Sequence, residues 1–130
     1  MMKLTQKQAG ITVTSIITAI LHLAAAFDRT LFPEGPDPLF ILNGIGYFGL
    51  LAAYITPISL LAGKHKLISK IMIGFAVLTI LAWLYIWVFQ YVIMQGVSFF
   101  SRDSWYGVPA KIAEVLLILF LSMDDDFDLI

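Results

Sequence analysis

Three stretches of the sequence contain no charged residue and are each long enough to cross a lipid bilayer. They cover residues 8–27, 39–63 and 71–100, and they are 20, 25 and 30 residues long. A helix needs about 20 apolar residues to cross the hydrocarbon core. A fourth stretch, 109–123, contains Lys111 and Glu114, so it crosses only if the Lys111 side chain extends toward the interface. The pattern predicts an all-α fold, with one domain (residues 1–130) of four transmembrane helices in up-and-down order.

The composition agrees with a membrane location. Hydrophobic residues make up 60% of the chain and charged residues 13%, whereas soluble domains have about 45–50% and about 25%. The chain contains no cysteine, which excludes disulfides, thiolate-bound metals and thiol redox chemistry.

The Lys and Arg residues that flank the apolar stretches divide unequally between the two sides. One side carries Lys3, Lys7, Lys64, Lys66 and Lys70. The other side carries Arg29, Arg102 and Lys111. Because the cytoplasmic side usually has the excess of positive charge, we expect a multi-pass protein of a prokaryotic cytoplasmic membrane with both termini in the cytoplasm. The acidic end "MDDDFDLI" counts little in this rule, and we expect it to be solvated.

Proline and glycine set the expected boundaries. The segment "DRTLFPEGPDP" is predicted to be a loop because its prolines oppose helix formation, and Pro57 is predicted to kink the second helix. The third stretch would form about 45 Å of helix, which exceeds the bilayer core. We therefore expect a break at Gly96, an interfacial segment anchored by aromatic residues, and a fourth helix that opens at Pro109.

The stretch "ILNGIGYFGLL" contains Gly44, Gly46 and Gly49 in a G-x-G-x-x-G spacing. A dinucleotide site would require a preceding strand and an acidic residue about 20 positions later, but this motif lies inside an apolar helix and that later residue is Lys64. We expect no nucleotide here and no nucleic-acid partner. At 100° per residue, one face of the helix instead carries Gly46, Gly49, Ala53 and Pro57. Such small-residue faces let membrane helices pack closely.

The first helix is predicted to present a matching face around His22. Its members lie three, four or seven positions from His22: Ser15, Thr18, Ala19, Ala25, Ala26 and Arg29. We expect this face to pack against the glycine face of the second helix, because small, weakly polar faces favour helix association in lipid.

Three helices are predicted to place a polar side chain at one level near the outer interface: His22, Asn43 and Glu114. By helical rise, each lies within about 6–8 Å of its helix end. Gln90 is a further candidate for this layer, with Asp28, Arg29 and Lys111 above it. Ionisable groups in membrane spans often mark functional sites, so the layer suggests a binding site for a proton, a cation or a small ligand. The alternative is that these groups only hold the helices together, with Lys111 and Glu114 paired three residues apart.

His22 could also serve as a single axial ligand for a chlorin or a five-coordinate haem, or could contact a quinone. The other histidine, His65, is predicted to lie at the opposite end of the bundle, which argues against a bis-histidine haem. No span repeats His or carboxylate residues at ligand spacing, so no metal site is expected.

The aromatic run "AWLYIWVFQY" spreads around a helix. Trp87 and Tyr91 are predicted to anchor the outer interface. Trp83 is predicted either to pack in the bundle or to offer a flat surface to a lipid, quinone or partner.

Three segments, "HLAAAF", "FILNGIGYFGLLAAYITP" and "ILAW", resemble a group of small prokaryotic four-helix integral membrane proteins of uncharacterised function, whose layout is loosely DoxX-like. The resemblance covers about the first two thirds of the chain. It implies a four-helix membrane protein and no particular activity.

The leading hypothesis for function is a small accessory or structural subunit that associates with a larger membrane complex or with itself. The alternative is a binding or transport protein that uses the polar layer of His22, Asn43 and Glu114. No nucleophile with an adjacent base is found, so the sequence favours a non-enzymatic role and leaves catalysis open.

Overall fold

The computed structural model describes residues 5–56, 63–96, 98 and 102–123, and for residues 102–104 the backbone alone. The described residues form helices and turns without a strand, which confirms the all-α prediction. The elements are α1 (Gln6–Ala26), α2 (Pro38–Ile55), α3 (His65–Trp83), the π-helix η2 (Leu84–Met94) and α4 (Arg102–Met123).

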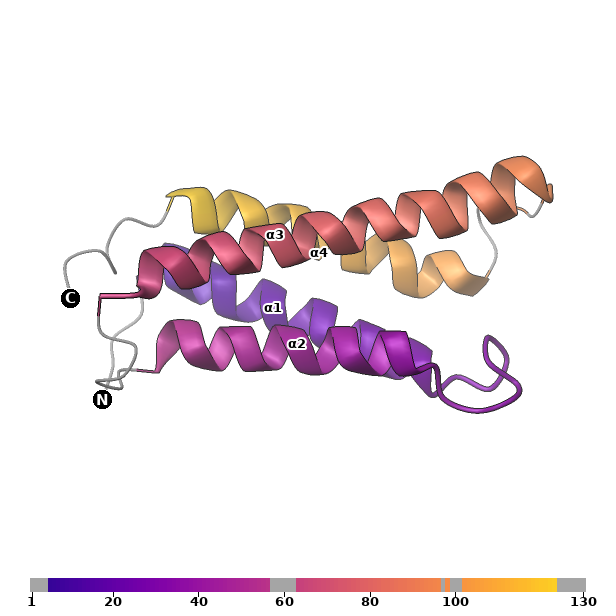
Figure 1. Cartoon of the computed structure of the whole chain (residues 1–130), viewed down its shortest axis with the longest axis horizontal. Coiled ribbons are helices and arrows are strands. Elements are labelled where there is room, and N and C mark those ends of the chain that lie inside the picture. Colours follow the sequence, from indigo (N-terminus) through magenta and orange to yellow (C-terminus); the bar gives the residue numbers. More distant parts are fainter. Residues whose placement is uncertain (1–4, 57–62, 97, 99–101, 124–130) are drawn as a thin grey trace.

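The four helical rods form an antiparallel bundle (Figure 1). α1 packs extensively against both α2 and α4, while α3 makes smaller contacts with α2 and α4. The first residue of α1 and the last residue of α4 lie at the same end of the bundle. Four helices, with η2 counted as the continuation of α3, are long and apolar enough to cross a membrane. The predicted up-and-down arrangement of four candidate spans is therefore confirmed.

Local sequence signals explain where the first two helices begin. Thr5 and Gln8 form a reciprocal capping box at the start of α1, which satisfies two backbone N–H groups that lack helical partners. Asp37 caps α2, and Pro38 occupies its first turn, where a missing N–H has no cost. The Asp37 N–H donates to the Ala26 carbonyl at 3.1 Å, so the loop brings the start of α2 directly back to the end of α1.

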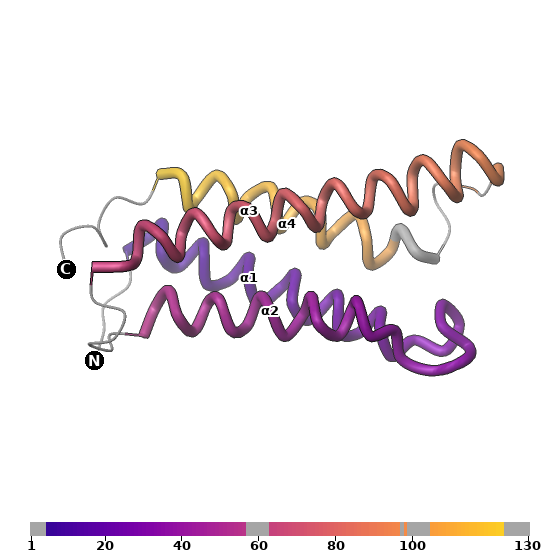
Figure 2. The backbone as a smooth tube through the Cα atoms, in the orientation of Figure 1, coloured from indigo at the N-terminus to yellow at the C-terminus, as the bar shows by residue number. Residues whose placement is uncertain are grey.

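α3 and η2 form one continuous rod of 30 residues, His65–Met94. The predicted break at Gly96 is confirmed, because the rod ends just before this residue, whose φ of +72° suits glycine. Helix nevertheless continues through Tyr91 to Met94, where the sequence predicted that the interfacial segment had begun. The tube in Figure 2 shows this end extending beyond the other helices.

α4 begins at Arg102, and Pro109 lies inside it, so the prediction that Pro109 opens this helix is wrong. Proline removes its own N–H bond to the preceding turn, and its ring crowds the carbonyl four residues earlier. Membrane helices tolerate this when neighbouring groups compensate. The earlier start places Glu114 much farther from the helix end than predicted. Pro57, Phe99, Phe100 and most of the acidic tail lie outside the described residues.

The glycine positions correct the predicted packing of α1 and α2. A Cβ on Gly44 would lie 2.6 Å from Leu23 and 2.9 Å from the Ala19 carbonyl, so Gly44 is where α2 closely approaches α1. A Cβ on Gly46 would meet Phe75 of α3, and one on Gly49 would meet nothing within 4 Å. The predicted face of Gly46 and Gly49 is therefore wrong as an α1 contact, because the actual face is rotated around α2.

The predicted small-residue face of α1 is confirmed except at its end. The residues buried on it are Ser15, Thr18, Ala19, His22, Ala25 and Ala26. Arg29 follows the helix and is exposed, so its predicted place on this face is wrong. α2 buries Gly44, Tyr47, Leu51 and Tyr54. These two faces provide much of the interior, with Met72 of α3 and Leu117 of α4 fully buried beside them.

Candidate functional site: a polar network at the centre of the bundle

Glu114 of α4 is fully buried in the bundle and lies between two charged or polar partners. The Lys111 ammonium donates to its Oε1 at 2.5 Å, and the Tyr47 hydroxyl of α2 donates to its Oε2. The Thr18 side chain of α1 lies close to the same carboxyl group. Hydrogen bonds to an ionised group are the strong ones, so these contacts compensate much of the cost of burying the carboxylate.

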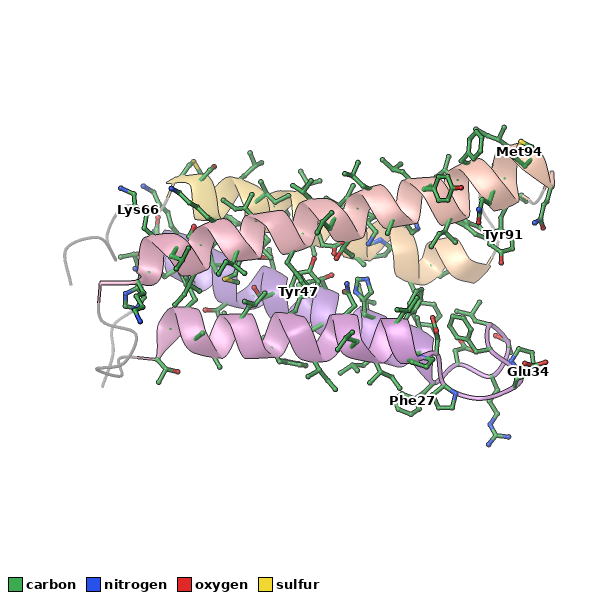
Figure 3. The ribbon with its side chains drawn as sticks, viewed as in Figure 1. Phe27, Glu34, Tyr47, Lys66, Tyr91 and Met94 are labelled. Carbon is green, nitrogen blue, oxygen red and sulfur yellow. The ribbon has the colours of Figure 1, made fainter. Side chains whose placement is uncertain are left out.

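A second set of contacts extends the network to α3. The Asn43 amide donates to the Thr79 hydroxyl at 2.8 Å, and Thr79 lies close to the Tyr47 hydroxyl. Thr79 donates in turn to the Phe75 carbonyl of its own helix at 2.9 Å. We call the following residues the central network: Thr18, Asn43, Tyr47, Thr79, Lys111 and Glu114. It draws side chains from all four spans, and Tyr47 is labelled at the middle of the bundle in Figure 3.

Four members of the central network lie near the middle of their candidate spans, whereas Asn43 lies nearer the start of the second span. The spans are Gln6–Ala26, Pro38–Ile55, His65–Met94 and Trp105–Met123. Glu114 is at the midpoint of the fourth, and Tyr47 and Thr79 lie at the midpoints of the second and third. Thr18 lies within a turn of the midpoint of the first. The prediction that Glu114 lies five residues from the start of its helix is wrong, because α4 starts at Arg102 and not at Pro109. The level of the layer relative to the outer interface stays a prediction.

His22 lies one turn along α1 from Thr18, at the edge of the network. Its Nδ1 is 2.7 Å from the Thr18 carbonyl. A carbonyl can only accept, so Nδ1 carries the hydrogen and a neutral ring keeps its lone pair on Nε2. The ring is 8% exposed and packs edge-on to Phe40 and at a tilt to Tyr47.

The structure joins some of the predicted site residues and separates others. Asn43 and Glu114 do not meet directly: Asn43 bonds to Thr79, Glu114 accepts from Tyr47, and Thr79 lies close to the Tyr47 hydroxyl. Arg29 is exposed and Gln90 is half-buried. Within the part of the chain that the structure describes, no hydrogen bond joins either of them to the network. Asp28 instead accepts from the Tyr106 hydroxyl at 2.6 Å and ties the first loop to α4.

Sequence reasoning missed Tyr47, Thr79 and Thr18 as members of the site. A signal for Tyr47 was present, since it follows Asn43 by four residues and therefore points in a similar direction from α2. No local signal marks Thr79, because its role depends on how α3 is rotated toward α2.

An open groove lies on the outside of α3 and α4, next to the central network. Its volume is about 400 Å³, and we call it the α3–α4 groove. It is lined by Trp83, Val108, Lys111, Ile112, Val115 and Leu116. Lys111 thus belongs to both the groove wall and the network. Gly107 lets Trp83 come close, because a Cβ there would lie 2.5 Å from the indole nitrogen.

The arrangement offers little for a metal or a porphyrin. Among the described residues, no three His, Asp or Glu side chains gather at one point. His65 is buried at the far end of the bundle beside Tyr54, which agrees with the prediction that it could not join His22 in a bis-histidine site. Binding of a chlorin, haem or quinone through His22 stays a prediction.

No family model, curated protein or solved structure matches this chain. The resemblance to DoxX-like proteins stays a prediction.

Proposed function

We propose that the protein is a small accessory subunit of a prokaryotic cytoplasmic membrane, with both termini in the cytoplasm, that associates through the outer surface of η2 with other membrane helices. The partner is a larger membrane complex or a second copy of the chain. The observation that carries this proposal is the exposed aromatic surface at the end of the longest rod.

η2 is weakly attached to the rest of the bundle. Among its residues, only Trp87 is buried. The rod to which η2 belongs has the smallest buried share of the four candidate spans. Since the described contacts of the bundle do not cover this surface, it is available to another protein.

The exposed surface of η2 carries ordered aromatic rings. Tyr85 and Phe89 stack with centroids 5.9 Å apart and planes 14° apart, and both are largely exposed. Aromatic residues are enriched at the centres of protein interfaces. π-helical segments are rare and occur frequently at functional positions. A stacked pair of exposed aromatic rings on a π-helix therefore suits recognition of a partner better than contact with fluid lipid alone.

Site-specific photocrosslinking tests this proposal. A photoreactive phenylalanine analogue is placed at Phe89, and, as a matched control, at Phe48, an exposed phenylalanine of α2. We expect position 89 to give a discrete protein adduct in native membranes and position 48 to give lipid adducts. Lipid adducts alone at both positions would contradict the proposal.

A second candidate function is favoured by the central network. Buried ionisable residues in a membrane span usually mark binding or transport, and Lys111 and Glu114 lie near the middle of α4. The Asn43 Oδ1 atom is also buried without a hydrogen-bond partner among the described residues, so it could accept a hydrogen bond from a ligand. In this reading the site is the central network and not the outer layer of His22, Asn43 and Glu114.

Ligand-dependent stabilisation separates the two candidates. A binding protein should unfold at a higher temperature in the presence of its ligand, and N43A should abolish that shift while the apo protein stays folded. A pure assembly subunit should show no such shift with cations, quinones or chlorins, and its unfolding should depend on the partner only.

A further inference from the structure

The start of α3 carries three exposed lysines, Lys64, Lys66 and Lys70. The rod that follows Lys64, His65–Met94, contains no Asp or Glu. We propose that this end of α3 binds an anionic glycerophospholipid, with the phosphate group between the Lys64 and Lys70 ammonium groups and an acyl chain along the outside of α3. This proposal does not depend on assembly through η2, because η2 forms the other end of the rod.

Two of these lysines flank an exposed apolar side chain. Lys64, the N-cap residue of α3, and Lys70 lie three positions before and after Leu67. At about 100° per residue, they project about 60° to either side of it. Leu67 is 56% exposed, and a lysine side chain is long enough to bring its ammonium group past such a neighbour. A phosphate group outside Leu67 can therefore accept hydrogen bonds from both ammonium groups.

The face of α3 that begins at Leu67 continues toward the middle of the rod as an apolar strip. Its further members, Ile71, Gly74 and Leu78, lie within about 40° of Leu67 around the helix, and all three are exposed. A Cβ on Gly74 would meet nothing within 4 Å, so no contact among the described residues requires a glycine there. Alanine would form a more stable helix. A glycine at this position lets an acyl chain lie directly against the backbone.

Charge complementarity selects an anionic headgroup. Among the described residues, no salt bridge involves Lys64 or Lys70. The acids whose side chains are described lie in the loop between α1 and α2, at the opposite end of the bundle (Figure 1), or in the middle of α4: Asp28, Glu34, Asp37 and Glu114. Lysines beside a membrane span attract anionic lipids, so an anionic lipid supplies a counter-charge that these acids do not.

The level of the lysines suits a lipid headgroup. Lys66 is labelled at this end of the bundle in Figure 3. If His65–Met94 crosses the membrane as a span, its first turns lie at the membrane surface, where lysine side chains extend toward the headgroups. A soluble phosphate would contact the lysines and leave the apolar strip uncovered, whereas a phospholipid contacts both.

Native mass spectrometry tests the choice of headgroup. The purified chain is titrated in detergent with phosphatidylglycerol and with phosphatidylcholine of the same acyl chains, and the affinity for the first bound lipid is measured. We expect phosphatidylglycerol to bind about tenfold more tightly. K64Q/K70Q should lower its affinity to that of phosphatidylcholine. The matched control K7Q/R29Q removes two exposed cations elsewhere and should keep the preference.

Two further measurements separate the lipid from other sources of negative charge. Glycerol 3-phosphate has the phosphate without an acyl chain, and we expect it to bind far more weakly than phosphatidylglycerol. A chain that ends at Met123 lacks the four aspartates of the acidic end and should keep the lipid preference. A preference seen only in this shortened chain would mean that the aspartates neutralise the lysines, and this would overturn the proposal.

Three other results would overturn it as well. They are equal affinities of the wild-type chain for the two lipids, an equal loss in K7Q/R29Q and K64Q/K70Q, and binding of glycerol 3-phosphate as tight as that of the lipid. The comparison of the two lipids uses the wild-type chain, so it does not depend on a variant that folds.

Discussion

The middle of the bundle and its η2 end differ in what their side chains contact. At mid-span, Glu114 and Tyr47 are enclosed, and hydrogen-bonding groups from all four spans meet. In η2, only Trp87 is buried, and the outside carries exposed aromatic and aliphatic side chains. In lipid, polar groups identify the interior and apolar surface identifies the exterior. We therefore expect the central network to hold the four helices together, and η2 to make contacts outside the chain.

The largest effect is expected from removing Glu114. E114A leaves the Lys111 ammonium buried without its partner, and breaking a buried pair in this way costs about 3–5 kcal/mol of the free energy of unfolding. The free energy is measured by reversible unfolding in mixed micelles. The control K111M/E114M removes both charges and should unfold close to wild type, because apolar replacement of a buried pair is often neutral. A wild-type free energy for E114A would show that the pair does not hold the bundle.

A smaller loss is expected when Tyr47 loses its hydroxyl. Y47F removes the donor to Glu114, and a hydrogen bond to a charged group contributes about 1.5–3 kcal/mol. The matched control is Y91F on η2, where the ring is 41% exposed, and its free energy of unfolding should change by less than about 0.5 kcal/mol. Equal effects of the two substitutions would remove the distinction between the two regions.

Glycine substitutions test the helix contacts of the interior. G44A places a methyl group against the backbone oxygen of Ala19, so α1 and α2 must separate at a cost of about 1–3 kcal/mol. G49A meets open space and should be neutral or should stabilise α2 by up to about 1 kcal/mol. The unfolding temperatures of both variants are compared in the same detergent. A lower unfolding temperature for G49A alone would mean that a different face of α2 packs against α1.

The smallest effect on stability is expected in η2. F89A should change the free energy of unfolding by less than about 0.5 kcal/mol, because Phe89 is 47% exposed. The same variant should lose the co-purifying partner. A large loss of stability would place η2 inside the folding unit and weaken the case for an external partner.

The number and type of helices could be predicted from the sequence. A chain in lipid needs long uncharged stretches to cross the bilayer and places its charges between them, so the spans can be counted directly. The sequence also identified Glu114, Asn43 and His22, since polar residues are conspicuous in apolar spans. It could not fix the rotation of α2, so it chose Gly46 and Gly49 for a contact that Gly44 makes. The predicted distance of Glu114 from the start of its helix was wrong. Pro109 was taken as the first residue of the fourth helix, although it lies within α4.

The most direct test is the membrane depth of the central network. Nitroxide spin labels are placed at Phe48, Leu78 and Val115, the lipid-facing neighbours of Tyr47, Thr79 and Glu114. Their collision rates with oxygen and with a water-soluble nickel complex are compared with those of labels at Leu39, Leu67 and Met123 near the ends of the same helices. The account predicts that the three central labels lie deepest and at one common depth. Equal exposure of central and terminal labels to the nickel complex would contradict it.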